Sequence, residues 1–483
     1  MDKSSITINN LAKKKVLIYG LGREGESSYK LLRQFYPQKR LGLADSRSLQ
    51  EMDLGWKEIM KNDSLLDLHF GHDCFRDISK YQVVIKSPGI AFATREIKKA
   101  LSQNIIVTSE TEIFLNRMYQ QTIGVTGTKG KSSTSTLIHH LIKDKIDSIL
   151  LGNMGVPAFT FWNKTKNKKN WFVYEMSSHQ LDRLKISPHI AVFLNLMPDH
   201  LDYFKTPRSY FKAKSNIAIH QSHNDFLIYN MDDKKISAIA NDSQAQKITF
   251  SITGNKKSFC FWDDVGLWYR SKAQEKHKLI LKEKDLRGVN LSLKHNLLPA
   301  VIIAKMMGVS DKSIVSRCKT YKSPRFRLEF VGKYKEIEFY NDSAATIPEA
   351  SMSALASLNY RIATLIVGGS DKFLDYRKLA QNIVDCGIKH LITFPITGPR
   401  IALLVKDMAH KHNQPSPKIK HVKTMKGAIT HAYRVTPPGK ICLLSPASAS
   451  FSTFKDYQDR GETFNYWVQK IGDDSKKYRT NSK

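Results

Sequence analysis

The chain has 483 residues, and its 76 lysines and arginines against 44 aspartates and glutamates give a formal net charge of +32 at pH 7. This length is too great for one hydrophobic core and predicts two to four domains. The longest apolar run, residues 190–197, is far too short to span a bilayer. The amino-terminal stretch lacks the apolar segment of a secretory signal, so we expect a cytoplasmic protein.

Cysteine spacing and charge pattern exclude some classes of site. The 5 cysteines are scattered and never form C-x-x-C, which argues against a disulfide framework or a zinc site. The positive charge is compatible with nucleic-acid binding, but it is spread along the chain, and its densest cluster, residues 163–169, is typical of a solvated loop. A nucleic-acid-binding NTPase stays an alternative. A basic field would equally attract multiply anionic substrates.

The first α/β unit surrounds a glycine-rich loop. An apolar strand at 16–19 leads into Gly20–Gly25, which fits G-x-G-x-x-G, and a second strand at 41–44 ends in Asp45. This arrangement is typical of a Rossmann-like domain, predicted here over residues 1–118, and by itself suggests a nicotinamide-dependent oxidoreductase or a site for another nucleotide-like ligand. A third strand runs into the turn at 87–90, which is either part of a ligand site or a simple Pro-Gly turn.

The strongest motif is residues 122–133, TIGVTGTKGKSS, which predicts a phosphate-binding loop between a strand and a helix. Lys131 would reach the outer phosphates of a nucleotide triphosphate, and the Ser132 hydroxyl would contact a magnesium ion. The strict G-x-x-x-x-G-K-[ST] pattern is not met, because Val125 stands where its first glycine is required. A glycine-rich turn in a linker is the alternative.

Polar groups follow the other strands predicted in this central region. Glu175 ends an apolar strand at 171–174 and could hold magnesium, or simply be a solvated strand end. A helix further on carries Lys212 and Lys214, which would ordinarily form a solvated face. Short runs between 225 and 287 predict a small β excursion.

A helix beginning at His295-Asn296 completes the central domain, predicted over residues 119–323, in which Asn296 could cap the helix or contact a base. The Ser323-Pro324 step predicts the start of a third domain, residues 324–483. Strands there alternate with helices, which indicates a Rossmann-like parallel sheet, and the polar tail is expected to fray. The fold class is therefore α/β with three domains: a Rossmann-like first domain, a P-loop ATPase-type central domain with a small β excursion, and a Rossmann-like third domain.

Twelve blocks occur in this order along the chain: GLGREG, SPGI, TGTKGKSS, GNMG, EMSSHQL, PDHLDYF, KAKSNI, HNLLPA, RLEF, YNDSAAT, GGSDK and SPASASFSTFKDYQDRGETF. Together they resemble the Mur ligases of peptidoglycan synthesis over about residues 15 to 465, and among them the members that add D-glutamate to UDP-N-acetylmuramoyl-L-alanine. The resemblance implies an ATP-dependent ligase with two magnesium ions, acting in the cytoplasm as a monomer without a membrane span or a specific nucleic-acid partner.

The resemblance also implies roles for individual residues. The UDP-substrate site would comprise Arg23, Asp45, Arg47, Ser87, Asn153 and His200. The ATP site would comprise Gly127, Thr128, Lys129, Gly130, Lys131, Ser132, Ser133, Asn296, Arg327 and Asp342. Magnesium would be held by Ser132, Glu175 and, if it is carbamylated, Lys214. The carboxylates of D-glutamate would meet Thr346, Lys372, Ser450 and Tyr457. Lys131, His200, Lys214 and Arg327 would act in catalysis.

The implied reaction starts with attack of a carboxylate oxygen on the γ-phosphate of ATP, which brings two anions together. Lys131, Arg327 and the two magnesium ions would neutralise the developing charge. The amine of D-glutamate would then attack the resulting acyl phosphate. A sister ligase that adds another amino acid is the nearest alternative, and Lys372 together with the serine-rich segment 445–454 argues against it.

Overall fold

The computed structural model describes residues 6–152, 156–283, 294–321, 324–358, 361–371, 374–451 and 453–480. The chain divides into two compact units, of which the first comprises Met1–Asp285 with His295–Thr320 and the second Leu286–Lys294 with Tyr321–Lys483. Within these described ranges, no helix combines the length and the apolar character needed to cross a membrane.

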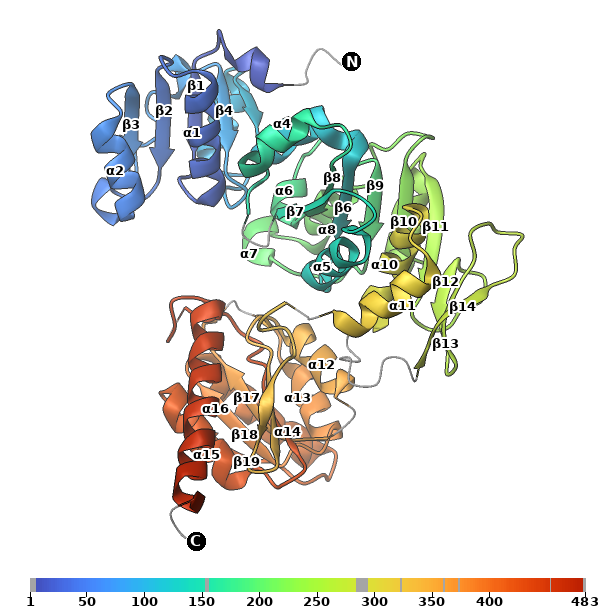
Figure 1. The fold of residues 1–483 in the computed structure, drawn as a ribbon. Coiled ribbons are helices and arrows are strands. Elements are labelled where there is room, and N and C mark those ends of the chain that lie inside the picture. The colour runs from blue at the N-terminus through green and yellow to red at the C-terminus, as the bar shows by residue number, and fades with distance from the viewer. Residues whose placement is uncertain are drawn as a thin grey trace. The chain divides into compact units, whose positions relative to one another are not determined.

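The first unit begins with a five-stranded parallel sheet in the order β3-β2-β1-β4-β5 (Figure 1). Its strands are β1 (Val16–Tyr19), β2 (Leu41–Asp45), β3 (Leu66–Phe70), β4 (Val83–Lys86) and β5 (Ile106–Thr108). The associated helices are α1 (Arg23–Phe35), α2 (Leu54–Asn62), α3 (Arg95–Ser102) and α4 (Glu110–Met118). Every residue of β1 and β4 is buried. The strand order reverses between these two strands, which is where open α/β sheets bind ligands.

The same unit contains a nine-stranded sheet in the order β14-β13-β12-β11-β10-β9-β6-β8-β7. Its strands are β6 (Thr122–Thr126), β7 (Ser148–Gly152), β8 (Trp171–Glu175), β9 (Ile190–Phe193), β10 (Phe226–Asn230), β11 (Gln246–Ser251), β12 (Cys260–Trp262), β13 (Gly266–Tyr269) and β14 (Lys278–Lys282). The helices are α5 (Lys131–Ile142), η5 (Ala158–Lys166), α6 (Ser178–Leu181), α7 (Leu201–Phe204), α8 (Pro207–Ser215), α9 (Lys234–Asp242), α10 (Lys294–Met306) and α11 (Asp311–Thr320).

The predicted β excursion is smaller than residues 225–287. Strands β10 and β11 pair in parallel with their neighbours and are joined by α9, so they continue the main sheet. Only β12, β13 and β14 form the antiparallel part, and the backbone N–H of Asp263 donates to the carbonyl of Gly266 in the turn between the first two. Short apolar runs alone do not distinguish parallel from antiparallel strands.

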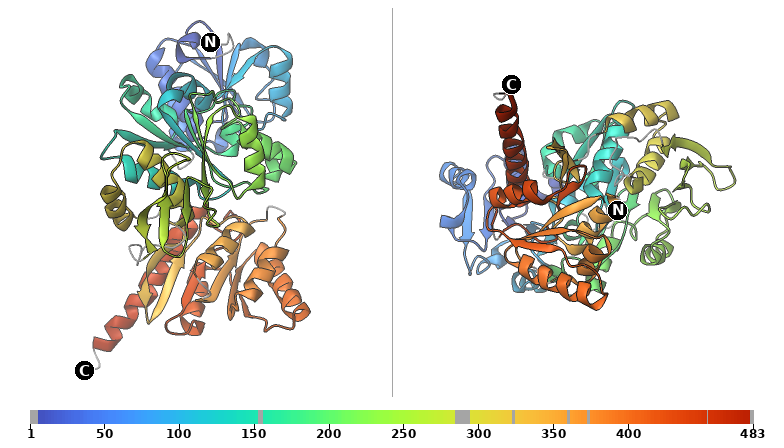
Figure 2. Two further views of the ribbon diagram at one scale, coloured as in Figure 1. Left: turned by 90° about the vertical axis from the view of Figure 1, so that its right-hand side faces the viewer. Right: turned by 90° about the horizontal axis from the view of Figure 1, so that it is seen from below.

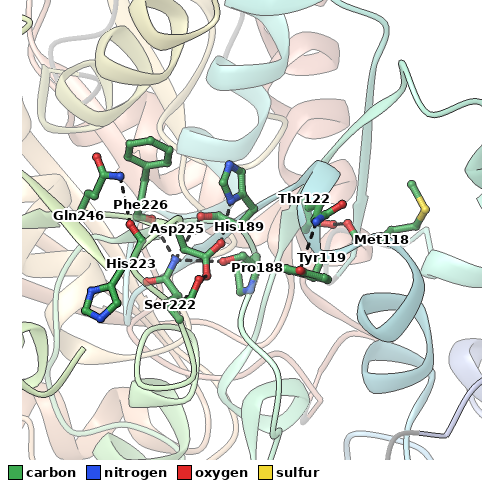
Figure 3. Close-up of polar contacts among 12 residues, drawn as sticks. Met118, Tyr119, Thr122, Pro188, His189, Ser222, His223, Asp225, Phe226 and Gln246 are labelled. Carbon is green, nitrogen blue, oxygen red and sulfur yellow. Dashed lines mark hydrogen bonds and ion pairs between the residues drawn. The ribbon is translucent and has the colours of Figure 1, made fainter. Parts of the chain in front are cut away.

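The amino-terminal ends of the central strands are held together by polar contacts (Figure 3). Asp225, just before β10, accepts hydrogen bonds from the backbone N–H and hydroxyl of Ser222 at 2.7 and 2.8 Å, and one of its carboxylate oxygens lies 2.8 Å from Nδ1 of His189. The Thr122 hydroxyl donates to the Met118 carbonyl at 2.6 Å. These contacts leave the carboxyl ends of the strands, at the opposite edge of the sheet, for the phosphate loop.

The second unit is a six-stranded sheet in the order β15-β16-β20-β17-β18-β19. Its strands are β15 (Glu329–Tyr334), β16 (Ile337–Asn341), β17 (Ile362–Gly368), β18 (His390–Phe394), β19 (Lys418–His421) and β20 (Ile441–Leu444). Its helices are α12 (Pro348–Ser357), α13 (Arg377–Asp385), α14 (Thr397–Lys411), α15 (Met425–Val435) and α16 (Tyr457–Thr480). The β15–β16 hairpin is antiparallel and the other pairings are parallel, in agreement with the predicted alternation.

The polar tail was expected to fray, but α16 continues through it to Thr480 and projects past the edge of its sheet in both views of Figure 2. Gly472 lies inside this helix, where it packs against an aromatic ring. A Cβ atom built on Gly472 would come within 2.4 Å of the Tyr334 ring. This contact between α16 and the β15–β16 hairpin cannot be read from the composition of the tail.

Candidate active site

The phosphate loop joins β6 to α5 and has the geometry predicted for it. Gly130 caps the helix with φ of 80°, and a Cβ there would lie 2.7 Å from Oδ1 of Asn296. Oδ1 of Asn296 also accepts a hydrogen bond from the Thr134 hydroxyl at 3.1 Å, which ties the start of α10 to α5. Only glycine avoids both the strain and the collision at this position. The helix therefore presents its first backbone N–H groups at the end of the loop.

A second loop supports the first. The amide of Asn195, just after β9, accepts from the backbone N–H of Lys129 at 2.8 Å and donates to the Lys129 carbonyl at 3.1 Å. The Thr128 hydroxyl lies 3.0 Å from the Met197 carbonyl and 3.1 Å from the Tyr210 hydroxyl. The loop is thus fixed in shape by its own neighbours.

Two lysine amines lie together beneath the loop. Lys131 Nζ donates to the carbonyls of Gly127 and Thr128 at 2.9 and 3.0 Å. Lys214 Nζ, from α8, donates to the same Gly127 carbonyl at 2.8 Å and to the Thr126 hydroxyl at 3.1 Å. The Lys214 side chain is fully buried, and burial together with the charge of Lys131 holds its pKa well below the ordinary value. The neutral amine is therefore favoured at this position.

Acidic groups flank these amines. Glu175 ends β8, is 1% exposed, and lies beside β6 because it pairs in register with Val125. Burial raises the pKa of Asp199, but the charges of Lys129, His200 and Lys131 together outweigh burial. The pKa of this carboxyl therefore lies below its ordinary value. Nε2 of His200 lies 3.8 Å from Oδ2 of Asp199. These contacts place Glu175, Asp199 and His200 at the carboxyl edge of the central sheet with the phosphate loop.

A separate cavity of about 400 Å³ lies at the switch point of the first sheet. Its walls include Arg23, Asp45 and Ser87, three of the residues predicted for the UDP substrate, and also Gly152 from the central sheet. The Asp45 carboxylate accepts from the backbone N–H of Leu21 at 2.8 Å and forms a 2.8 Å ion pair with Arg47. Burial raises the pKa of Asp45, but the hydrogen bonds from Arg47 and Leu21 lower it by more, so the pKa of this carboxyl lies below its ordinary value.

Three predicted residues need separate mention. His200 is absent from the walls of this cavity and lies instead with Asp199 near the phosphate loop. Asn153 and Lys372 lie outside the described residues.

In the second unit, the remaining predicted residues lie before β15, after β16, after β20 and at the start of α16. Asp342 follows β16, and its carboxylate accepts from the backbone N–H of Leu328 at 3.2 Å and from the Ser445 hydroxyl at 2.8 Å. Arg327 lies between Phe326 and Leu328, whose φ values of 65° and 46° are both in the left-handed region. Strained backbone of this kind is concentrated at functional sites. Ser450 is buried, Thr346 is half-buried, and Tyr457 is 38% exposed.

Sequence reasoning assigned no role to Arg460, which joins the loop after β16 to the loop after β20. Its side chain is 1% exposed and donates to the Ser343 hydroxyl at 3.0 Å, the Ser343 carbonyl at 2.8 Å and the Ser448 carbonyl at 3.0 Å. Burial lowers the pKa of Arg460 to about 9, although Asp342 opposes the shift. Arg460 lies within the block that begins at Ser445, and Asp199 lies within PDHLDYF, but the sequence assigned no role to either. Asn195 stands outside every block, and a single polar residue after a strand carries no motif.

Comparisons with known proteins agree with the geometry. Residues 125–297 match the sequence model of the Mur ligase middle domain, and residues 326–448 match that of the Mur ligase glutamate ligase domain. The chain is 33% identical to the UDP-N-acetylmuramoylalanine–D-glutamate ligase of Oenococcus oeni, over 95% of this chain and 98% of the relative. It is 30% identical to the enzyme of that name from a Geobacillus strain, with the same coverage of 95% and 98%.

Solved structures support the fold. The UDP-N-acetylmuramate–alanine ligase MurC of Thermotoga maritima aligns with a TM-score of 0.58 at 16% identity, covering 95% of this chain and 100% of that one. The MurF ligase of the same organism, solved in complex with ADP, aligns with a TM-score of 0.56 at 14% identity, covering 98% and 100%. At these identities the likeness concerns the fold alone, whereas the identity to the curated relatives shows that the chain belongs to the Mur ligase family, with the UDP-N-acetylmuramoylalanine–D-glutamate ligases.

Proposed function

We propose that this chain catalyses the ATP-dependent addition of D-glutamate to UDP-N-acetylmuramoyl-L-alanine through an acyl phosphate, in peptidoglycan precursor synthesis. The observation that carries the proposal is the phosphate loop with Lys131, beside the buried Lys214 and Glu175. The curated relatives are named for this activity, and the chain aligns with 98% of the length of each. The proposed location is the cytoplasm and the proposed state a monomer.

The residues at the loop fit ATP with magnesium. Among the described residues, no three His, Cys, Asp or Glu side chains gather as a metal cluster. Magnesium bound with a nucleotide needs only one or two protein ligands, because phosphate and water oxygens complete its shell. Ser132, at the start of α5, and Glu175 would supply these ligands, and magnesium would offset the charge of the phosphates. We keep two ions as the proposed number.

Lys214 fits a third ligand only in modified form. An ammonium group does not bind a cation, but the lowered pKa favours the neutral amine, which can add carbon dioxide and lose a proton to form a carbamate. A carbamate is a carboxylate on a long stem. Its neighbours, Lys131 and the Thr126 hydroxyl, are groups that would stabilise a negative charge there.

The chain's own groups would lower the barrier mainly through charge. Lys131 would neutralise the γ-phosphate as the substrate carboxylate approaches, and Lys129, Gly130, Gly127, Thr128 and Ser133 would enclose the phosphates. Asp199 would hold His200 at the junction with the substrate. In the second unit we assign Arg327 and Asp342 to ATP and Thr346, Lys372, Ser450 and Tyr457 to D-glutamate, on the resemblance alone. Domain limits at residues 118 and 323 belong to the same proposal.

For the UDP-substrate, the cavity at the first sheet supplies the support. Arg23, Asp45, Arg47 and Ser87 lie in or beside it. We assign Asn153 to the same site on the resemblance alone. The Asp45–Arg47 pair holds the loop after β1 through the Leu21 backbone, so its proposed role is to shape the cavity as well as to contact the ligand.

Mass spectrometry of the reaction product tests the proposal. Purified protein with ATP, magnesium, UDP-N-acetylmuramoyl-L-alanine and D-glutamate should form a product one glutamyl residue heavier than the substrate. Lys131→Met should lower the rate at least a hundredfold, the usual scale for a group that stabilises transition-state charge, while Lys164→Met, on the solvated cluster of 163–169, should not change it. Absence of the heavier product with the wild-type protein would contradict the proposed function.

A further inference from the structure

The first unit contains a second cavity, of about 360 Å³, whose walls share only Pro88 with the cavity assigned to the UDP-substrate. It is lined by the ends of β4 and β5 and by the segment that follows α6. None of its lining residues has a part in the proposed reaction. Several of its polar groups have structural roles, such as Ser109, which caps α4, but one buried amine in its wall does not, and this makes the cavity a candidate binding site.

A buried amine lies in its wall. Lys86, the last residue of β4, is 2% exposed, and its hydrogen bond to the Ser87 carbonyl is long, at 3.3 Å. Its amine lies 4.7 Å from the centroid of the Phe92 ring. No carboxylate of the described residues forms an ion pair with it, and burial lowers its pKa to about 8 although Asp182 and Glu24 oppose the shift. A buried ammonium with most of its donors unused is costly unless a partner arrives.

The charge of the cavity is positive. Arg183 and Lys185 also line it, and Arg183 lies over the same Phe92 ring at 5.0 Å. Its two acids are already engaged: the Glu112 carboxylate accepts from the Thr108 hydroxyl at 2.8 Å, and that of Asp182 from the Tyr203 hydroxyl at 3.3 Å. Burial raises the pKa of both acids. Asp182 and Glu24 attract the Lys86 amine through space, but no carboxylate of the described residues is ion-paired with Lys86 or Arg183, so an incoming anion would contact them without displacing an ion pair.

The rest of the wall is apolar. Leu101 and Ile106 are 39% and 36% exposed, and Ile105 and Leu184 continue the apolar surface inward. A ligand that fits this cavity needs one anionic group to pair with the buried amine and an apolar part to cover the apolar wall. We propose that the cavity binds an amphipathic carboxylate, whose head contacts Lys86 and Arg183 and whose apolar chain packs on Leu101, Ile106 and Leu184.

Such binding would change the affinity of the neighbouring cavity for its ligand. Lys86 directly precedes the turn at 87–90, and the Ser87 hydroxyl donates to the Gly20 carbonyl in the glycine-rich loop. A ligand on Lys86 therefore changes the affinity for the UDP-substrate, and the substrate changes the affinity for the ligand by the same factor. This consequence rests on the proposed function, whereas the binding itself does not.

Isothermal titration of the full chain with sodium decanoate, below its micelle concentration and with ADP and magnesium saturating the phosphate loop, tests the binding. We expect one saturable site for decanoate and at least tenfold weaker binding of decanol, which lacks the charge. Lys86→Met should weaken decanoate binding at least tenfold. Lys164→Met, which removes a charge from the solvated cluster of 163–169, should leave it unchanged.

Two further variants keep the test decisive if Lys86→Met does not fold. Arg183→Gln alters an exposed side chain, and Leu101→Trp fills the cavity from a partly exposed position; each should weaken decanoate binding several-fold. The proposal is overturned if the wild-type chain shows no saturable site, if decanol binds as tightly as decanoate, or if these variants bind decanoate as the wild type does. Because no turnover is measured, these outcomes do not depend on ligase activity.

Discussion

Single buried charges shape both units. Arg460 is enclosed by carbonyl and hydroxyl oxygens of two loops, so its guanidinium organises backbone that contains several of the predicted substrate residues. Lys214 and Lys86 are buried as well, but each has fewer hydrogen-bond partners than a charged amine can use. This contrast separates a structural cation from two that are available for chemistry or binding.

Replacing Arg460 should disturb both stability and D-glutamate binding. Arg460→Met leaves the carbonyls of Ser343 and Ser448 without this donor, and each buried acceptor left unsatisfied costs about 1–3 kcal/mol. We expect a lower urea midpoint and a higher KM for D-glutamate. Arg460→Lys keeps the charge but not the planar fork of donors, so its urea midpoint and its KM should lie between those of the wild type and of Arg460→Met. If Arg460→Lys matches the wild type in both measurements, the fork has no role.

His179 should contribute to acid sensitivity. Burial, with help from the charges of His200 and Lys86, lowers the pKa of His179 to about 3. In the unfolded chain His179 binds a proton near pH 6.5, whereas in the folded protein it stays neutral until about pH 3. The free energy of unfolding should therefore fall as the pH drops from about 6.5 towards 3. His179→Phe, which cannot titrate, should lose this part of the dependence in urea titrations at several pH values.

Glu24 provides the opposite sign as an internal comparison. Burial raises its pKa to about 7, against the Gln180 hydrogen bond and the Lys86 charge. Its contribution is present at low pH and is lost as the pH rises from about 4.5 through 7. Glu24→Gln should therefore remove the part of the fall in the free energy of unfolding that occurs between about pH 4.5 and 7.

For the His179 prediction, equal pH profiles of the free energy of unfolding for the wild type and His179→Phe would be the contradicting result, because they would show that His179 titrates normally.

At the scale of elements, the phosphate loop depends on the junction of β6, α5, α10 and the segment after β9. Asn195 and Asn296 hold it from two sides. The loop therefore keeps its shape through neighbours that come from distant parts of the chain. A motif in the sequence identifies such a loop, whereas the contacts that stabilise it come from the fold.

Gly130→Ala tests this junction. The left-handed conformation should cost about 1–2 kcal/mol for alanine, and the contact with Oδ1 of Asn296 at 2.7 Å should also displace the loop. We expect the Kd for ADP to rise at least tenfold in calorimetry. Gly387→Ala is the matched control, because Gly387 also has a positive φ, of 63°, but has no atom within 4 Å of its would-be Cβ. It should lose stability without losing ADP affinity, and equal ADP affinity in both variants would contradict the account.

At the scale of the whole molecule, the α/β class, the positions of many strands along the chain and the phosphate loop were predictable, because buried parallel strands appear as short apolar runs and the loop has a motif. The separation of β10 and β11 from the antiparallel strands was not, since sheet membership depends on pairing between distant segments. The burial of Lys86 and the contacts of Arg460 were not predictable either, because a charged residue at a strand end or in a helix is ordinarily solvated.

The net charge of +32 leads to a prediction for the whole chain. A basic field should draw in the anionic nucleotide and UDP-sugar substrates, so kcat/KM for both should fall as potassium chloride is raised, while kcat changes less. Addition of RNA or DNA should not stimulate ATP hydrolysis. Stimulation by nucleic acid would favour the alternative of a nucleic-acid-dependent NTPase.

The most direct test of the central claim is phosphate release from ATP in the presence of UDP-N-acetylmuramoyl-L-alanine and one amino acid at a time. D-glutamate should support release, and L-glutamate, glycine, L-lysine and meso-diaminopimelate should not. Release with another of these amino acids, or without any amino acid, would contradict the assignment of this chain as a D-glutamate-adding ligase.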